Sequence, residues 1–186
     1  AELFDADIRG VYVIDDQNML QCPATQGEHA TRIKALFPIR VEGSATGAAI
    51  ASGHVVSYAD VMNGADVPDG LRKLAHSIGR NYSLAQAPMV WQGQGIGAVN
   101  AARFDMRPFN AKECTLLETF ARQAVIAIQN ARLFNETQEA LEQQTASAEV
   151  LTVIGQSVSD AKPVFARIID RVARILDTHY INIGLI

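Results

Sequence analysis

The feature that most constrains the fold of this chain is a long stretch in its second half without helix-breaking residues. No proline occurs between Pro108 and Pro163, and Gly155 is the only glycine in that interval. Because proline and glycine are the residues least compatible with a helix interior, the stretch predicts one long helix. Asn110 can cap its first turn, and Glu113, three residues further on, completes a capping box.

The two halves of this predicted helix differ in the width of their apolar face. The first half has the wide face of a helix packed on a domain, formed by Leu117, Phe120, Ala121, Ala124, Val125, Ile128, Ala131 and Phe134. The second half keeps a narrow stripe, with Gln138 and Thr145 at positions where a heptad seam favours apolar residues. Such a stripe gains little from packing on its own domain, so we interpret it as the seam of a homodimer, formed by Phe134, Leu141, Ala148 and Leu151. The alternative is a long, frayed C-terminal helix.

The bulk properties argue against several classes of protein. The chain has 186 residues and a net charge of −4, and an acidic balance is not typical of nucleic-acid binding. No apolar run is long enough to span a bilayer, and the N-terminal sequence AELFDADIRG lacks the features of a signal peptide. We therefore expect no membrane contact. Cys22 and Cys114 are far apart and have no CxxC partner, which favours reduced thiols and a cytoplasmic location.

The part of the chain before the long helix carries strand and helix signals in an order typical of an α+β fold. Strands are predicted at 8–14, 19–24, 55–58, 82–91 and 96–102, and helices at 44–53 and 69–79, with a short helix within 27–36. Residues 61–69 contain Asn, Gly, Asp and Pro and predict a mobile surface loop. Because hairpins and helical excursions join the strands, we expect a largely antiparallel sheet.

Several segments carry a resemblance to a known family. They are 47–53 with Val55, Val56 and Asp60, then Ala87-Pro88-Met89, QGQGIGAVNAAR at 92–103, Phe109, and LLETFARQAVIAIQNARLFNET at 116–137. Together they resemble a GAF domain of bacterial sensor proteins. The resemblance implies an antiparallel sheet of about six strands with helices on both faces, which serves in small-molecule or light sensing or in dimerisation. Residues 139–165 are similar to the connector between tandem GAF domains in sensor histidine kinases.

The C-terminal tail repeats the apolar pattern of the N-terminus. Residues 175–186 follow the pattern of residues 3–14, and an amphipathic helix with Pro163 in its first turn precedes them. We therefore expect three parts: a GAF domain at 1–115 that lacks its first helix, a connector helix at 116–160, and the first helix and strand of a second GAF domain at 163–186. The first domain should then have one apolar sheet face uncovered, and the helix at 164–176 is a candidate to cover it, in the same chain or across a dimer.

No residue pattern in the chain indicates catalysis, and we expect no enzyme activity within it. The chain contains no nucleophile elbow, P-loop or HExxH motif, and the glycines at 93–97 lie between two strands, which favours a hairpin turn over a phosphate loop. The histidines are scattered, and neither cysteine has a neighbouring histidine. Covalent bilin, haem and metal are therefore not expected, and any cofactor is unidentified. Cys114, in the first helical turn, is either a redox-sensitive thiol or a buried inert one.

The resemblance also places a ligand pocket between the sheet and the middle helix. On this sequence the candidate ligand-binding residues are Ser57, Tyr58, Asp60, His76, Ser83 and Trp91. Asp60 could instead only fix the following loop, and Trp91 could be core. Cyclic-nucleotide-binding members of the family carry an Asn-Lys pair, whereas here Asn100 is followed by Ala101, which argues against that ligand.

These observations lead to a sensory input module as the expected function. It would relay a small-molecule signal through a long dimeric helix to an output domain outside this chain, a histidine kinase by resemblance. Two alternatives stay open: a ligand-free dimerisation and spacer domain, and the input module of a nucleotide cyclase.

Overall fold

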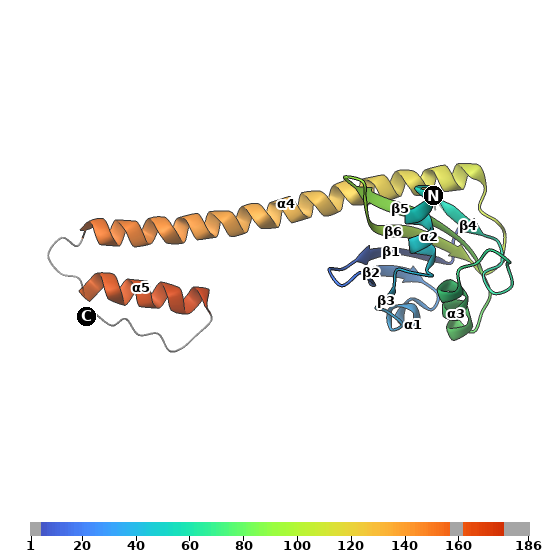
Figure 1. The fold of residues 1–186 in the computed structure, drawn as a ribbon, viewed down its shortest axis with the longest axis horizontal. Helices are drawn as coiled ribbons and strands as arrows, with labels where there is room; N and C mark the ends of the chain where they lie inside the picture. The colour runs from blue at the N-terminus through green and yellow to red at the C-terminus, as the bar shows by residue number, and fades with distance from the viewer. Residues whose placement is uncertain (1–4, 157–161, 177–186) are drawn as a thin grey trace. The chain divides into compact units, whose positions relative to one another are not determined.

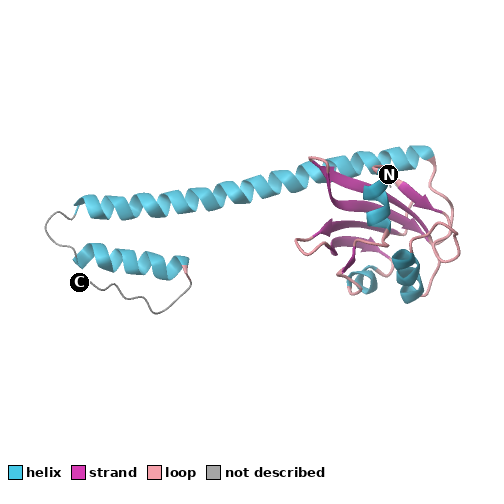
Figure 2. Cartoon of the chain, in the orientation of Figure 1, coloured by secondary structure: helices cyan, strands magenta, loops and turns pink. Residues whose placement is uncertain are grey.

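The computed structural model describes residues 5–156 and 162–176 and divides into two compact units, 1–128 and 129–186. The longest helix contributes residues to both units (Figure 1, Figure 2). The strands are β1 (Ile8–Ile14), β2 (Met19–Gly27), β3 (Ile39–Arg40), β4 (Val56–Tyr58), β5 (Ser83–Trp91) and β6 (Gln94–Arg103). The helices are α1 (Ala30–Lys34), α2 (Ala45–Ser52), α3 (Asp69–Ile78), α4 (Ala111–Gln156) and α5 (Lys162–Ile175).

The first unit is built on one six-stranded sheet, in the order β3-β2-β1-β6-β5-β4. Every pair of neighbours is antiparallel, so the predicted α+β class and antiparallel sheet are confirmed. Strand β3 has two residues, which pair with Met19 and Leu20. A strand of two residues is too short to show an alternation of apolar and polar residues, so the sequence pattern does not predict it.

The β5–β6 hairpin shows why its glycines are needed. The turn is shorter than predicted, because Gln92 and Gly93 alone connect the strands, with φ angles of 49° and 80°. Two successive positive φ angles are typical of the turn that matches the twist of a β-hairpin. Gly97 has a φ of 153°, and a Cβ atom there would lie 2.0 Å from the Tyr12 carbonyl oxygen. The hairpin interpretation of 93–97 is therefore confirmed.

The first part of α4 covers one face of the sheet. The capping box is confirmed, because the Asn110 amide donates to Glu113 Oε2 at 2.8 Å and the Glu113 amide donates to Asn110 Oδ1 at 3.0 Å. The helix buries its apolar side against β5 and β6, with Leu117, Ala121 and Val125 in this core. From Ala131 onward the described helix side chains are mostly exposed, so the predicted wide apolar face ends earlier than Phe134.

Helices α1, α2 and α3 cover the opposite face of the sheet (Figure 1). The predicted ends of α2 are confirmed, since the Ser44 hydroxyl accepts a bond from the Gly47 amide at 3.0 Å and Gly53 ends the helix with a φ of 70°. Gly79 ends α3 in the same way, with a φ of 79°. Left-handed glycines at these positions satisfy the last helical carbonyls without steric cost.

The loop after β4 differs from the surface loop that its composition predicts. Val61 and Val67 are buried in the core between the sheet and α3. The Asp60 carboxylate accepts bonds from the side chain of Asn81 and from the backbone of the following turn. The Arg72 guanidinium donates to three loop carbonyls, at 2.8, 3.0 and 3.3 Å. Two apolar anchors and these polar contacts hold the loop, and loop composition alone does not reveal them.

In the second unit, α5 lies antiparallel beside the second half of α4 (Figure 1). Val164 is buried, and Arg171 forms an ion pair of 2.9 Å with Glu149. The predicted tail helix is confirmed, whereas the predicted strand beyond it lies outside the described residues. None of the described helices is long and apolar enough to cross a membrane.

Candidate functional site

A cavity of about 40 Å³ lies inside the first unit, between the sheet and helices α1, α2 and α3. Its walls are mostly apolar and are formed by Ile8, Leu20, Ile33, Leu71, Ile78 and Leu84, among others. The volume is roughly a quarter of the ~150 Å³ cavity that holds benzene in an engineered protein. As described, the cavity has room for a molecule of only a few non-hydrogen atoms.

The polar groups at this cavity are all uncharged. Gln86 on β5 donates a hydrogen bond to the Thr46 hydroxyl on α2. Asn100 on β6 lies opposite Gln86 in the strand register, and its side-chain oxygen is buried without a hydrogen-bond partner. Since buried polar atoms are nearly always paired, an unpaired acceptor at a cavity is a position where a donor group is missing.

Two tyrosines at the cavity remain protonated. Burial raises the pKa of Tyr12 far above its ordinary value, and a hydrogen bond with the Asn100 side chain opposes that shift in part. Burial likewise raises the pKa of Tyr82. None of the described lining residues carries a charge, so the site favours an uncharged ligand.

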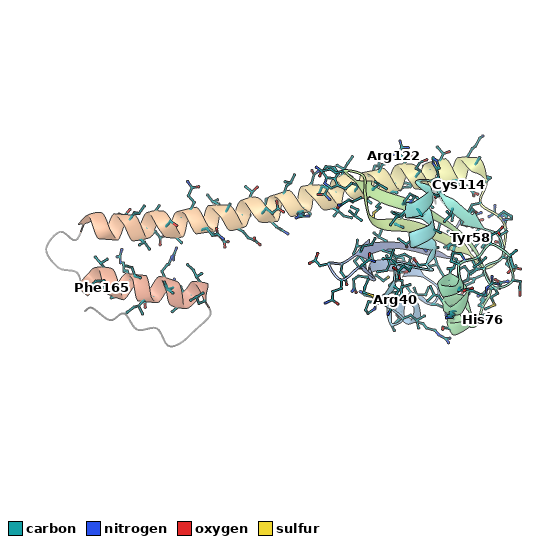
Figure 3. All side chains as sticks on the ribbon, viewed as in Figure 1. Arg40, Tyr58, His76, Cys114, Arg122 and Phe165 are labelled. Carbon is teal, nitrogen blue, oxygen red and sulfur yellow. The ribbon has the colours of Figure 1, made fainter. Side chains whose placement is uncertain are left out.

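The structure places the six predicted ligand-binding residues elsewhere: none is among the described residues that line the cavity. Ser57 is exposed, Tyr58 packs on the edge of the α3 core, and Asp60 fixes the loop that follows it. His76 is exposed on α3 (Figure 3), the Ser83 hydroxyl donates to the Arg107 carbonyl at 2.8 Å, and Trp91 lies on the hairpin with 40% of its surface exposed. Their roles as ligand contacts stay predictions.

The residues that do line the cavity were not selected from the sequence. Gln86 and Asn100 are polar residues within strands that otherwise bury small apolar side chains. A polar residue at a buried strand position is the signal that could have identified them. Tyr12 carries no such signal, because an aromatic residue in a strand is ordinary core.

Strands β5 and β6, which carry Gln86 and Asn100, also contact the segment that begins α4. Strand β6 ends at Arg103, whose side chain is 2% exposed and donates to the Glu113 carboxylate and to the Asp5 carbonyl. The guanidinium also lies 4.0 Å from the ring centroid of Phe109. The Arg103 hydrogen bond is the main reason that the pKa of Glu113 lies below its ordinary value. Glu113 therefore belongs both to the helix cap and to a buried ion pair with the sheet.

Partial burial, and then the neighbouring Glu113 charge, raise the pKa of Cys114. A raised pKa disfavours the reactive thiolate, so the inert thiol is the better supported of the two alternatives. No group of three or more His, Cys, Asp or Glu side chains within 5–156 and 162–176 could hold a metal ion.

The sheet, its two helical layers and the cavity between the sheet and helices α1, α2 and α3 define an α+β domain. The chain belongs to the GAF domain family, whose profile matches residues 1–128. This confirms the family that the sequence resembles and includes the first part of α4 within the domain.

Solved structures with this fold come from several bacterial proteins. One is a GAF domain/HD domain protein from Geobacter sulfurreducens, at 23% identity and a TM-score of 0.59, covering 72% of this chain and 87% of that one. Another is a domain described as that of a two-component sensor histidine kinase from Sinorhizobium meliloti 1021, at 17% identity and a TM-score of 0.57, covering 73% and 86%. A third is the GAF-B domain of DevS from Mycobacterium smegmatis, at 23% and 0.55, covering 71% and 86%. At these identities the likeness shows the fold alone. No curated protein matches the chain.

Proposed function

We propose that this chain is a regulatory input module in which a small uncharged molecule binds the internal cavity and changes the position of α4. The proposal rests on one observation: β5 and β6 contribute residues to the cavity and also contact the segment that begins α4. These strands place Gln86 and Asn100 at the cavity, and their ends at Ser83 and Arg103 contact the segment that starts α4. A ligand that moves the strands would therefore act directly on the first turn of the helix. Ligand binding shifts such an equilibrium only when its affinity differs between the two helix positions.

The cavity chemistry limits the class of ligand. Phosphate-bearing molecules would lack a cation among the described lining residues, and haem would lack an axial histidine there. A ligand with one hydroxyl or N–H group and a small apolar body fits the walls and can donate to the free oxygen of Asn100. A larger ligand requires outward movement of α1 or α3.

The proposed output lies outside this chain, and α4 of a homodimer connects to it. A sensor histidine kinase is our first candidate, supported by the Sinorhizobium likeness and by the similarity of residues 139–165 to a connector between GAF domains. Helix α5 would open a second GAF domain, since it has Pro163 in its first turn and the amphipathic pattern expected there. The small cavity volume supports a second candidate function, a dimerisation and spacer domain that binds nothing.

Native mass spectrometry of the purified chain, combined with thermal shift assays, tests the ligand. We expect acetamide or 2-propanol at high concentration to raise the melting temperature of the wild type, and acetate to have no such effect. Asn100→Leu should abolish the shift, because it removes the free acceptor, while Gln94→Leu, an exposed change on the same strand, should keep it. If uncharged molecules have no effect and no bound mass is found, the spacer function replaces the sensory one.

A further inference from the structure

A row of residues at one level of the sheet lies on the cavity side, and its two ends differ in hydrogen bonding. The row consists of Thr25 on β2, Gly10 on β1, Asn100 on β6 and Gln86 on β5, which are paired in the strand register. Ile8 and Tyr12, two positions before and after Gly10, both line the cavity, so the row faces α1, α2 and α3. At one end of the row, Gln86 donates a hydrogen bond to the Thr46 hydroxyl.

The other end of the row has two buried side-chain oxygens without a hydrogen-bond partner. They are Thr25 Oγ1 and Asn100 Oδ1, on the two strands that flank Gly10. Asn100 as a whole is only 3% exposed. Since buried polar atoms nearly always have a partner, two unpaired oxygens beside the same residue point to one missing group that binds both.

Gly10 keeps the space between these two oxygens open. Its φ angle is not positive, so its backbone conformation does not require glycine. A Cβ atom there would lie 2.6 Å from Asn100 Oδ1 and 3.6 Å from Thr25 Cβ. The Asn100 side chain therefore leans over β1, into the position that the side chain of any other residue would fill. Glycine weakens the interior of a strand, and it often marks a place that a ligand or another backbone approaches closely.

The contact with Tyr12 explains why the oxygen of the Asn100 amide is the unpaired atom. The hydrogen bond between these side chains acts against the burial that raises the pKa of Tyr12, so it favours the ionised phenol. A hydrogen bond has this effect when the amide N–H donates to the phenol oxygen. The amide nitrogen of Asn100 is therefore directed to Tyr12, and Oδ1 is left to accept a hydrogen bond from another donor.

The two oxygens define the chemical group that can satisfy both. Asn100 Oδ1 only accepts hydrogen bonds, and the Thr25 hydroxyl can accept as well as donate. A nitrogen with two N–H bonds can donate one to each oxygen, whereas an alcohol has a single O–H and a carboxylate has no donor. The described residues that line the cavity carry no charge, which disfavours an ammonium group. An uncharged N–H2 group, as in a primary amide or a urea, is the remaining match.

We propose that the space over Gly10 is the polar end of the ligand site and that it selects a primary amide or a urea, whose N–H2 group donates to Thr25 Oγ1 and Asn100 Oδ1. This inference rests on the proposed function and narrows its ligand from any small uncharged molecule to one chemical class. The rest of the ligand lies against the apolar walls of the cavity that Asn100 also lines, which limits it to a few non-hydrogen atoms.

Three probes with equal numbers of non-hydrogen atoms test the class of ligand. Acetamide has two N–H donors, 2-propanol has one O–H donor, and acetone has none. Titration of the full chain with each probe, followed by the melting temperature, gives a dissociation constant for each. We expect acetamide to bind about fivefold more tightly than 2-propanol, because one additional net hydrogen bond has about that effect on affinity. Acetone should bind most weakly.

Substitutions of Thr25 separate the effect of its hydroxyl from the shape of the site. Thr25→Val keeps the shape and removes the hydroxyl, so it should weaken acetamide binding about fivefold and leave 2-propanol, which needs only Asn100, unchanged. Thr25→Ser keeps the hydroxyl and should keep the preference for acetamide. General effects of the solvent are the same in these proteins, so the ratio between probes is compared. Gly10→Ala places a methyl group against Asn100 Oδ1 and should abolish binding of both molecules.

The stability of the ligand-free variant gives a second measurement. Thr25→Val should be at least as stable as the wild type in urea unfolding, because it removes a buried hydroxyl that has no partner. A loss of stability, together with equal binding of acetamide and 2-propanol, would show that a bound water already satisfies both oxygens, and it overturns the inference.

The remaining outcomes separate this inference from the proposed function. Equal binding of acetamide and 2-propanol to the wild type overturns the selection by the space over Gly10 and keeps a small uncharged ligand. An acetamide affinity that Thr25→Val leaves unchanged has the same consequence. If none of the three probes binds, the proposed function itself is overturned, and this inference with it.

Discussion

Removing the carboxylate of Glu113 should destabilise the domain far more than removing any other charge on α4. Glu113→Ala leaves the guanidinium of Arg103, whose side chain is 2% exposed, without its counter-charge and removes one half of the helix cap. Breaking a buried ion pair on one side costs about 3–5 kcal/mol. The Glu113 side chain is 20% exposed and water can reach part of the site, so we expect the lower end of that range. For a chain of this size, about 3 kcal/mol lowers the melting temperature by roughly 6–12 °C.

Urea unfolding of the wild type, Glu113→Ala, Arg103→Met and the double variant Arg103→Met/Glu113→Ala measures this effect. The double variant should be less destabilised than the sum of its single changes, because the buried charge that lacks a partner is gone. Glu118→Ala is the matched control, since its pair with Arg122 at 2.7 Å is exposed and such pairs contribute about 0.3–0.5 kcal/mol. A Glu113→Ala cost equal to that of the control would refute the buried coupling between sheet and helix.

The same pair should appear in the pH dependence of stability. The pKa of Glu113 in the folded domain lies below its ordinary value of 4.5, so its ionised form stabilises the fold above about pH 4.5. That contribution is lost as the pH falls through the lowered folded-state pKa. Glu113→Gln has no group that titrates there, so its free energy of unfolding should fall less steeply below pH 4.5. Equal slopes for the two proteins would contradict the assignment.

Two further substitutions test the fold around the cavity. Gly97→Ala should cost more than about 3 kcal/mol in urea unfolding, because it combines a strained φ of 153° with a backbone clash, whereas Gly93→Ala in the same hairpin meets no atom within 4 Å and should cost about 1 kcal/mol. Similar costs at the two glycines would refute the clash. Arg72→Leu removes the hydrogen bonds to three loop carbonyls, each worth about 1.5–3 kcal/mol at a charged donor, and should make residues 61–68 cleavable in limited proteolysis. Lys73→Leu, at an exposed neighbouring position, should leave the cleavage pattern unchanged.

Local signals in the sequence predicted much of the framework. The caps at Ser44 and Asn110, the glycine ends of α2 and α3, and the strand β1 are as predicted, because each depends on residues within a few positions of one another. The family also followed from short sequence segments, and the match over residues 1–128 confirms it.

Only the tertiary structure determines where the cavity lies and how the sheet contacts the first turn of α4. Gln86 and Asn100 are fourteen positions apart, and only the antiparallel register of β5 and β6 places them side by side. The candidates chosen from the sequence lie on chain segments near that site, but the twist and layering of the sheet direct their side chains to the loop, the surface or the hairpin instead. Nothing in the sequence indicates that Arg103 is buried. Its burial results from the contacts that Phe109, Glu113 and Asp5 make with it at the end of β6. Sequence patterns report the conformation of neighbouring residues, whereas a site forms where distant segments pack, and packing depends on the whole fold.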